Sequence, residues 1–430
     1  MEGLVIFVIM LFLILIKVPV AFSMATAAAV AIWMRGLPFP LIVQRMFMAV
    51  NTFPLLAVPL FILVGQIMNT GGVSRKIFDF CRVWLRHITG SLGHVNVAAS
   101  VIFAGMSGSA VADASGLGII EIKEMKDDGY DSGFSAAITA ASSTIGPIIP
   151  PSIPLVIYAV LAEQSVGRLF LGGIVPGLIM GAALMVQVYI VSKRNHYKVE
   201  PKASWGERAR MTFSAIPSLL TPTIILGAIL FGIVTPSEAG VIAIIYSILL
   251  GFLVHKELTL GSLYTMFLNT IKSTASILMI VASASIITWL ILSSGLPQKL
   301  AAFIFTVTEN KVIILLLINV VLLFLGCFLE GTSLITIMVP VLLPIVTALN
   351  VNLVHFGVFM VLNVMIGLIT PPVGMCLYIV TDIAKCSFAD TVRAVVPSII
   401  ALFIVLMLIT FVPELVTGLP DFLMGSSVVL

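Results

Sequence analysis

Charged side chains are scarce in this sequence. Of its 430 residues only 10% are Asp, Glu, Lys or Arg and 60% are hydrophobic, whereas about a quarter of an ordinary soluble protein is charged. A water-soluble enzyme cannot cover its surface with so few charges. The 22 basic and 19 acidic residues also leave no basic surface for nucleic acid, and so hydrophobic a chain is not disordered. The composition therefore predicts a membrane protein with no nucleic-acid partner.

Other features are lacking too. The four cysteines form neither a CxxC pair nor a disulfide framework. The alternating polarity that a transmembrane β-barrel needs is absent, because runs such as 313–328 and 399–411 are continuously apolar. The first apolar run has no basic flank and no small-residue cleavage site, so we expect a retained span rather than a signal peptide. With room for about ten or more spans of roughly 20 residues, the sequence predicts an all-α polytopic protein in the lipid bilayer.

One polar stretch interrupts the apolar runs near the middle of the chain. Six of the 22 basic residues fall between 192 and 210. Because basic loops favour the cytoplasm, we expect a basic cytoplasmic linker over residues 193–213.

Residues 74–89 show a different pattern. Ile77, Cys81 and Trp84 recur at helical spacing, while three arginines lie on another face. This pattern predicts an amphipathic arm in the membrane interface.

The chain matches itself when it is shifted by about half of its length. A single offset places Gly105 on Gly326 and the block Gly146–Pro151 on Gly367–Pro372. The spacing between the two glycine features is therefore the same in both halves. The match predicts an internal duplication, with a first repeat over 1–192 and a second over 214–430.

The flanks of the two glycine blocks differ in charge. Lys123 and Lys126 follow the first block, whereas the equivalent stretch 347–359 has no Lys or Arg. Since basic residues favour the cytoplasm, the two halves should have opposite orientations. The prediction is an inverted repeat, as in many secondary transporters.

A Pro-Pro pair interrupts an apolar run in each half, at Pro150-Pro151 and Pro371-Pro372. Proline lacks an N–H and cannot continue an α-helix, so carbonyls one turn earlier lose their partners. In lipid such carbonyls must line a cavity or meet a ligand, and a helix C-terminus suits a small cation. We expect broken, partly unwound helices over 134–162 and 354–381, with simple proline kinks as the alternative.

The glycine-rich blocks predict re-entrant hairpins. The apolar stretch over 95–122 is too short for two full spans, and its counterpart covers 312–349. Asp113 and Glu330 lie at apparent membrane depth, where a charge should face protein, water or an ion. The alternatives are that Asp113 caps a half-helix and that Glu330 is protonated and hydrogen-bonded.

Two other acidic residues have structural explanations. Thr235-Pro236-Ser237-Glu238 has the pattern of a helix capping box. Asp382 and Lys385, three positions apart, suit an ion pair on the surface of a helix.

The combined motifs resemble the large membrane subunit of tripartite ATP-independent periplasmic (TRAP) transporters. The residues that carry the likeness are Gly105-Met106-Ser107-Gly108-Ser109 with Asp113, Gly146-Pro147 with Pro150-Pro151-Ser152, Gly326 with Glu330-Gly331-Thr332, and Gly367 with Thr370-Pro371-Pro372. The likeness runs over nearly the whole chain, and its overall character favours the sialic-acid subgroup.

The resemblance implies sodium-driven uptake of an organic acid anion, sialic acid or a C4-dicarboxylate, across a bacterial inner membrane. It implies an elevator-type transporter that works with a small membrane subunit and a periplasmic substrate-binding protein. Na+ would be the coupling ion, with no organic cofactor. The implied sodium ligands are Ser107, Gly146, Ile149 and Pro150 for one ion and Gly326, Gly367 and Thr370 for the other. The implied substrate-binding residues are Ser109, Asp113, Ser152, Glu330 and Thr332.

Three other functions compete with this one. A proton-coupled carrier could titrate Asp113 and Glu330. An intramembrane serine protease would use the GxSG pattern at Gly105–Gly108, but all five histidines fall near span ends or in loops, so the serine lacks a base. A channel would need a continuous pore around an axis, which an inverted repeat does not provide. We therefore expect a carrier, not an enzyme.

Overall fold

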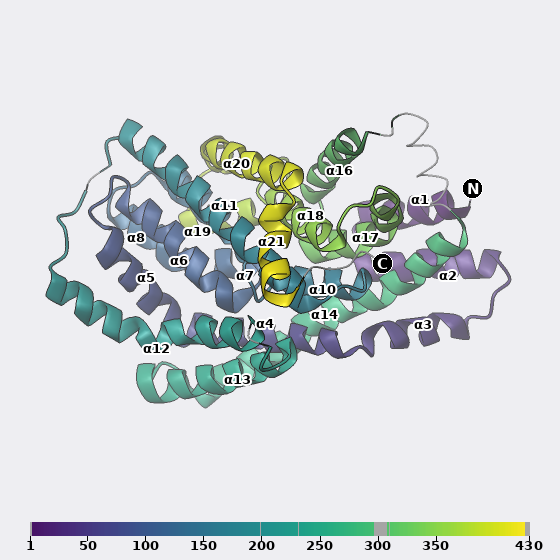
Figure 1. Ribbon diagram of the computed structural model, residues 1–430, viewed down its shortest axis with the longest axis horizontal. Helices are drawn as coiled ribbons and strands as arrows, with labels where there is room; N and C mark the ends of the chain where they lie inside the picture. Colours follow the sequence, from purple (N-terminus) through teal and green to yellow (C-terminus); the bar gives the residue numbers. More distant parts are fainter. Residues whose placement is uncertain (1, 198, 231, 296–307, 309, 426–430) are drawn as a thin grey trace.

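The computed structural model describes residues 2–197, 199–230, 232–295, 308 and 310–425 (Figure 1). These residues form helices joined by turns, with no strand in the described part of the chain. Seven of the helices in these residues are long and apolar enough to cross a membrane. The prediction of an all-α polytopic membrane protein is therefore confirmed. Lys198 of the expected linker, and residues 231, 296–307, 309 and 426–430 of the expected second repeat, lie outside the described residues.

In chain order the elements are α1 (Glu2–Leu15), α2 (Val20–Met34), α3 (Pro40–Val50), η1 (Phe53–Leu56), α4 (Ala57–Thr70), α5 (Val73–Leu85), α6 (Ser91–Ser107), α7 (Ala110–Ser115), α8 (Leu117–Asp127), α9 (Ser132–Ser143), α10 (Ile153–Leu161), α11 (Val166–Arg194), α12 (Trp205–Leu230), α13 (Pro236–Leu249), η2 (Leu250–His255), α14 (Leu260–Ser293), α16 (Lys311–Gly326), α17 (Gly331–Ala348), α18 (Leu353–Gly367), α19 (Met375–Ala384), α20 (Phe388–Phe411) and α21 (Glu414–Met424).

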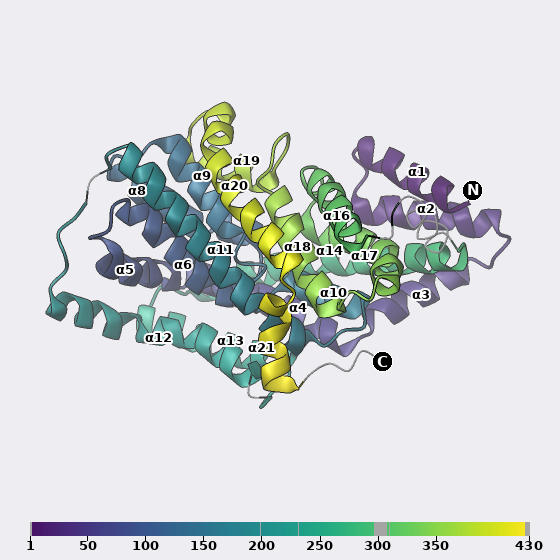
Figure 2. The same cartoon turned by 45° about the horizontal axis from the view of Figure 1, so that its top comes forward.

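One set of helices, here named the framework helices, comprises α1–α4 and α12–α14. The long helix α14 packs along α2, α3 and α4, and α13 packs between α4 and α12. In Figures 1 and 2, α1–α3 lie at the end of the molecule opposite α5 and α8. The predicted capping box at the start of α13 is confirmed, because Thr235 N–H donates to Glu238 Oε2 at 2.7 Å and Glu238 N–H donates to Thr235 Oγ1 at 3.3 Å.

The remaining helices from α6 to α11 and from α16 to α20, here named the repeat helices, pack in a reciprocal pattern. Helix α9 of the first half packs against α19 and α20 of the second, while α18 of the second half packs against α10 and α11 of the first. Likewise α10 packs against α17, and α19 packs against α7 and α8. The two halves are therefore interleaved rather than placed side by side.

Helix α18 forms the centre of this arrangement. Every residue from Val354 to Gly367 is buried. A helix that is apolar on all sides must be covered on all sides, and α18 is enclosed by α10, α11, α16, α17 and α20.

Both expected broken helices are interrupted at their proline pairs. Helix α9 ends at Ser143 and α10 begins at Ile153, whereas α18 ends at Gly367 and α19 begins at Met375. Pro150-Pro151 and Pro371-Pro372 are both cis peptide bonds. The intervening segments 144–152 and 368–374 are the two helix breaks referred to below.

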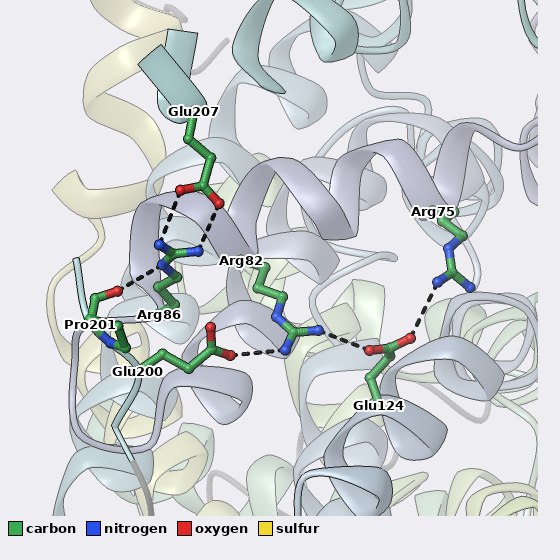
Figure 3. Close-up of polar contacts among 7 residues, drawn as sticks. All are labelled: Arg75, Arg82, Arg86, Glu124, Glu200, Pro201 and Glu207. Atoms are coloured by element: carbon green, nitrogen blue, oxygen red, sulfur yellow. Dashed lines mark hydrogen bonds and ion pairs between the residues drawn. The ribbon is translucent and has the colours of Figure 1, made fainter. Parts of the chain in front are cut away.

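Helix α5 is amphipathic and is anchored by ion pairs on its polar face (Figure 3). Arg82 lies between Glu124 of α8, at 3.0 Å, and Glu200, at 2.9 Å. Burial disfavours the charge of Arg82, but its hydrogen bond to Glu200 and the nearby acidic charges outweigh that effect and raise the pKa of the guanidinium. Arg82 thus connects α8 to the segment that follows α11.

Arg86 makes a second link from the end of α5. Its Nη1 and Nη2 atoms lie 2.8 and 3.1 Å from the two carboxylate oxygens of Glu207 on α12, and its Nε donates to the Pro201 carbonyl at 2.8 Å. Figure 3 shows the guanidinium between these two partners. Such two-pronged pairing is specific to arginine.

We expect Arg86→Glu to destabilise the protein by about 1 kcal/mol or somewhat more, because it places two acids together and leaves the Pro201 carbonyl without its donor. The exchange Arg86→Glu with Glu207→Arg should recover part of the loss. Apparent melting temperatures of the two single variants, the double variant and the wild type, measured in nanodiscs, would check this. A double variant no more stable than Arg86→Glu alone would show that the pair contributes nothing. Asp382 and Lys385, whose predicted ion pair is confirmed at 2.8 Å on an exposed helix face, offer a control pair.

Candidate functional site

The turn between α6 and α7, at the tip of the expected first hairpin, rests on the first helix break. Helix α6 ends at Ser107, and Gly108 turns the chain with φ +62°. A Cβ atom on Gly108 would lie 2.5 Å from the Pro151 carbonyl oxygen and 3.2 Å from the Ile153 nitrogen. Both the left-handed backbone and this close approach require glycine.

Asp113 lies behind this tip rather than in open space. Its side chain is 2% exposed, and the Ser107 hydroxyl donates to one of its oxygens. The other oxygen, Oδ2, has no hydrogen-bond partner among the described residues, and a Cβ built on Gly146 would overlap with it. The structure therefore brings Ser107, Asp113 and Gly146 together, with one carboxylate oxygen left for a further ligand.

The remaining residues of the first implied sodium set belong to the same break. A Cβ on Gly105 would lie 3.8 Å from the Pro150 carbonyl oxygen, so this carbonyl faces the end of α6. The Ile149 side chain packs against Gly177 of α11. Because an isoleucine side chain has no oxygen or nitrogen atom, only the backbone of Ile149 could bind an ion.

In the second half, the end of α16 meets the second break through a contact between two glycines. A Cβ on Gly367 would lie 2.6 Å from Gly326 Cα and 2.7 Å from its carbonyl carbon. The Gly374 N–H donates to the Cys327 carbonyl at 3.2 Å, and the Thr370 hydroxyl donates to the Ile366 carbonyl at 2.7 Å. Gly326, Gly367 and Thr370 therefore stand together where α16 and α18 both end.

The acidic and polar residues at the hairpin tips act as helix caps. Ser109 is the N-cap of α7 and accepts from the Ala112 N–H at 3.4 Å, so Asp113 is not the cap of this half-helix. Glu330, which the internal repeat equates with Ser109, is the N-cap of α17 and accepts from the Ser333 N–H at 3.0 Å and from the Thr332 hydroxyl. Glu330 is half-buried, so its carboxylate both caps a helix and reaches open space.

Two adjoining cavities, of about 380 and 340 Å³, open between the hairpin tips and α14. Their volumes fall in the range of small-molecule sites. Of the residues implied to bind substrate, Ser109, Glu330 and Thr332 line one or both cavities. Asp113 and Ser152 line neither: Asp113 faces Ser107 and Gly146, and Ser152 is fully buried as the N-cap of α10, where its hydroxyl donates to the Pro147 carbonyl.

The opposite wall comes from α14 and, in the smaller of the two cavities, also from Gln66 and Asn69 of α4; the sequence motifs included neither helix. Ser273, Ser276 and Ile277 line one or both cavities. A signal was nevertheless present, because the apolar run that forms α14 contains a single charged residue, Lys272, and a charge within a span calls for an explanation.

A protease site is not formed at the GxSG pattern. Ser107 pairs with Asp113, and no histidine hydrogen-bonds to Ser107 within the described part of the chain. His355 instead contacts the Ile409 carbonyl at 2.8 Å. The serine thus lacks the base that a nucleophile requires.

The geometry agrees with comparisons to known proteins. A sequence model of the DctM component of tripartite ATP-independent periplasmic transporters matches residues 7–415. The chain belongs to this family. It is therefore a multi-pass membrane transport protein rather than an enzyme, and one of three components, as the family name states. The family prediction made from the glycine and proline motifs is confirmed.

Several relatives in this TRAP transporter family have names that state a substrate. The sialic acid TRAP transporter large permease SiaM of Vibrio cholerae is 43% identical over 89% of this chain and 90% of its own length. The sialic acid TRAP transporter permease SiaT of Haemophilus influenzae is 38% identical over 88% of this chain, which spans 62% of that longer protein. The C4-dicarboxylate permease DctM of Pseudomonas aeruginosa is 35% identical over 88% of this chain and 89% of its own.

The fold is also found in a distant solved structure. The crystal structure of the Alcanivorax borkumensis YdaH transporter superposes with a TM-score of 0.66 over 87% of both chains, at 15% identity. The two proteins share an architecture, and the likeness is restricted to fold.

Proposed function

We propose that this DctM-family protein imports an organic acid anion, with sialic acid favoured, in symport with sodium across a bacterial inner membrane. Its partners would be a small membrane subunit and a periplasmic protein that delivers the substrate. The observation that carries the proposal is the pair of hairpin tips, each resting through glycine on a helix break beside the same cavities.

The first sodium site is supported by Asp113. A fully buried carboxylate with an unpartnered oxygen is costly unless a cation compensates it. Asp113 Oδ2 faces Gly146, three residues after the end of α9, where the C-terminal carbonyls add further negative potential. We therefore add Asp113 to the proposed ligands Ser107, Gly146, Ile149 and Pro150. Sodium is a hard cation that suits such oxygen ligands.

The second sodium site is supported by two converging helix ends. Helices α16 and α18 end at Gly326 and Gly367, whose backbones touch. The C-terminus of each helix carries about half a negative charge, so the two ends repel one another unless a cation lies between them. Thr370 keeps lone pairs free on its hydroxyl oxygen, because it acts as a donor to the Ile366 carbonyl.

An elevator mechanism is supported by the arrangement of the cavity walls. The hairpin tips supply one wall, and α4 and α14 of the framework helices supply the other. The reciprocal packing of the two halves is what an inverted repeat predicts. In this proposal the repeat helices carry Ser109, Glu330 and Thr332 past a stationary α14.

The substrate class follows from the relatives and from the cavity. V. cholerae SiaM carries sialic acid in its name, and P. aeruginosa DctM carries C4-dicarboxylate. Both names denote carboxylate anions. The greater identity and coverage of SiaM favour sialic acid, and a C4-dicarboxylate is the alternative.

A proton-coupled carrier is the second candidate function. Its support is the same unpartnered oxygen of Asp113, which could hold a proton instead of contacting sodium, together with the half-buried carboxylate of Glu330. The two candidates differ in which gradient drives uptake.

We expect uptake in proteoliposomes to require an inward sodium gradient and the substrate-loaded binding protein. The permease would be reconstituted with its small subunit and offered sialic acid on the cognate binding protein. Two sodium ions with one monovalent anion carry a net charge of +1, so 100 mV negative inside would supply about 2.3 kcal/mol and should accelerate uptake.

Three controls accompany this measurement: an equal proton gradient without sodium, omission of the binding protein, and clamping of the potential at zero. Uptake on the proton gradient alone would show that the coupling ion is the proton and not sodium. Sodium-driven uptake at a rate that does not change with the membrane potential would contradict the stoichiometry of two sodium ions to one anion.

A further inference from the structure

Helix α14 contains one charged residue in 34, and its position is unusual. Lys272 lies 12 positions after the first residue of the helix. At 1.5 Å per residue, this places it about 18 Å along the helix axis. The rest of the helix is apolar or carries uncharged polar side chains, and it is long enough to cross the membrane. An ionisable residue within such a span has a functional cause more often than not.

The helical geometry places Lys272 on a polar stripe. At about 100° per residue, Thr265, Asn269 and Ser276 lie within roughly 60° of Lys272 around the axis. Ser276 is one of the residues that line the larger cavity, and its hydroxyl donates to the Lys272 carbonyl at 3.0 Å. Lys272 is therefore on the flank of the face that forms the cavity wall.

The lipid-facing side of α14 lies elsewhere. Tyr264, Phe267 and Ile271 are 66%, 42% and 61% exposed, and they centre on a direction roughly 100° from Lys272 around the helix. The Lys272 side chain is exposed as well, and its ammonium makes no ion pair or hydrogen bond with the described residues. A free cation thus stands at the border between the lipid face and the cavity face.

The cavities need a positive charge if they are to hold an anion. Among the described residues that line them there is no lysine, arginine or histidine, and Glu330 is the one charged side chain. A carboxylate substrate beside Glu330 would be repelled unless a cation lies within reach. Lys272 is adjacent in sequence to Ser273, which lines both cavities.

We propose that Lys272 binds the carboxylate of the transported anion from the stationary wall of the cavity. In this proposal its flexible side chain would reach past Ser276 and Ser273, which line the cavities, toward an anion held opposite the Ser109 and Glu330 caps. The proposal rests on the proposed uptake of an organic acid anion and names the framework residue that recognises its charge. The competing explanation is that the lysine extends to the membrane surface and serves only as an interfacial anchor.

The test uses Lys272→Cys with chemical restoration of the charge. Cys81, Cys327 and Cys376 are buried, so Cys386→Ser removes the one partly accessible native thiol. In this background Lys272→Cys should lower sodium-driven uptake on the order of ten-fold, as expected for loss of a charged hydrogen-bonding partner. Reaction with 2-aminoethyl methanethiosulfonate, which installs an ammonium, should restore much of the uptake, and the anionic 2-sulfonatoethyl reagent should not.

Protection gives a second readout. Substrate with sodium should slow the modification of Lys272→Cys if the side chain contacts the bound anion. Ile271→Cys is the matched control. Ile271 is next to Lys272 in the sequence, but its side chain faces lipid, so charged reagents should not reach a cysteine there. Lys272→Arg should keep most activity, and size-exclusion profiles with the small subunit would verify folding.

Equal recovery with the ammonium and sulfonate reagents, or wild-type uptake by unmodified Lys272→Cys, would overturn the proposal. So would modification that substrate does not slow, which is the result expected of an interfacial anchor. Failure of the wild-type protein to take up the anion would instead contradict the proposed function, so the two failures are distinguishable.

Discussion

Replacing Gly367 with alanine is expected to abolish sodium-dependent uptake while leaving the protein inserted and assembled. The added Cβ would stand 2.6 Å from Gly326 Cα and 2.7 Å from its carbonyl carbon. Both atoms are backbone, so no side-chain rotation can relieve the clash. The ends of α16 and α18 would have to separate by about 1 Å, and misplacement on that scale lowers activity by roughly a hundred-fold in other active sites.

A matched control is available for this substitution. Gly227 also lies in a membrane-spanning helix, α12, and nothing lies within 4 Å of a Cβ built there. We expect Gly227→Ala to retain wild-type uptake. Gly326→Ala, whose Cβ would meet Gly367 Cα at 3.1 Å, should have a smaller effect than Gly367→Ala.

The measurement is the initial rate of uptake as a function of sodium concentration. A loss of sodium affinity at the second site should appear as a shift of the sodium curve to higher concentration or as complete loss. Wild-type sodium dependence in Gly367→Ala would mean that the contact between α16 and α18 is only packing, and the second sodium site would have to be placed elsewhere.

The interrupted helices could be predicted from the sequence because their signals are local. A Pro-Pro pair interrupts a helix whatever surrounds it, and the turn at Gly108, which has a positive φ in the structure, suits the glycine-rich block found in the sequence. Helix α9 ends at Ser143, four residues before Pro147, and α18 ends at Gly367, four residues before Pro371, as expected where a proline removes the N–H that would bond one turn back. The common spacing of the glycine features then links the two halves.

The directions in which the polar side chains point could not be predicted in the same way. Asp113 and Ser109 are four positions apart, close to one helical turn, yet Ser109 lines the cavities while Asp113 faces Ser107 and Gly146. The difference arises because Ser109 stands before the first turn of α7 as its cap, with extended backbone. The other side of Asp113 is covered by Gly146, which follows α9. This contact joins segments that are distant in the sequence, so no local signal predicts it.

The internal repeat in the sequence also could not identify α14 as a wall of the cavities. Internal repetition identifies residues that occur twice, and none of the matched motifs lies in α14. Ser273 and Ser276 are small hydroxyl residues that a helix can bury at little cost by donating to a carbonyl one turn back, so their type is uninformative. Lys272 was the informative residue, because only a charge conflicts with the apolar run.

Asp113→Asn is expected to raise the sodium concentration for half-maximal uptake by at least roughly ten-fold. The substitution keeps the size of the side chain and a partner for the Ser107 hydroxyl, but it removes the negative charge that faces Gly146. A cation in a water-poor site depends strongly on such a charge, and one tenfold change in affinity corresponds to about 1.4 kcal/mol. Ser107→Ala should act in the same direction but less, since it removes one neutral oxygen.

The control and the competing assignment make this experiment decisive for the role of Asp113. Asp382→Asn changes an exposed acid that pairs with Lys385 on the surface, and it should leave sodium dependence unchanged. If Asp113 contacted substrate instead, Asp113→Asn would alter the affinity for the anion and leave the sodium curve in place. If Asp113 carried protons, the variant would imitate its protonated form, so uptake would lose its dependence on a proton gradient. A shifted sodium curve with unchanged anion affinity is the one outcome that requires the carboxylate to face the ion, as its burial behind the hairpin tip indicates.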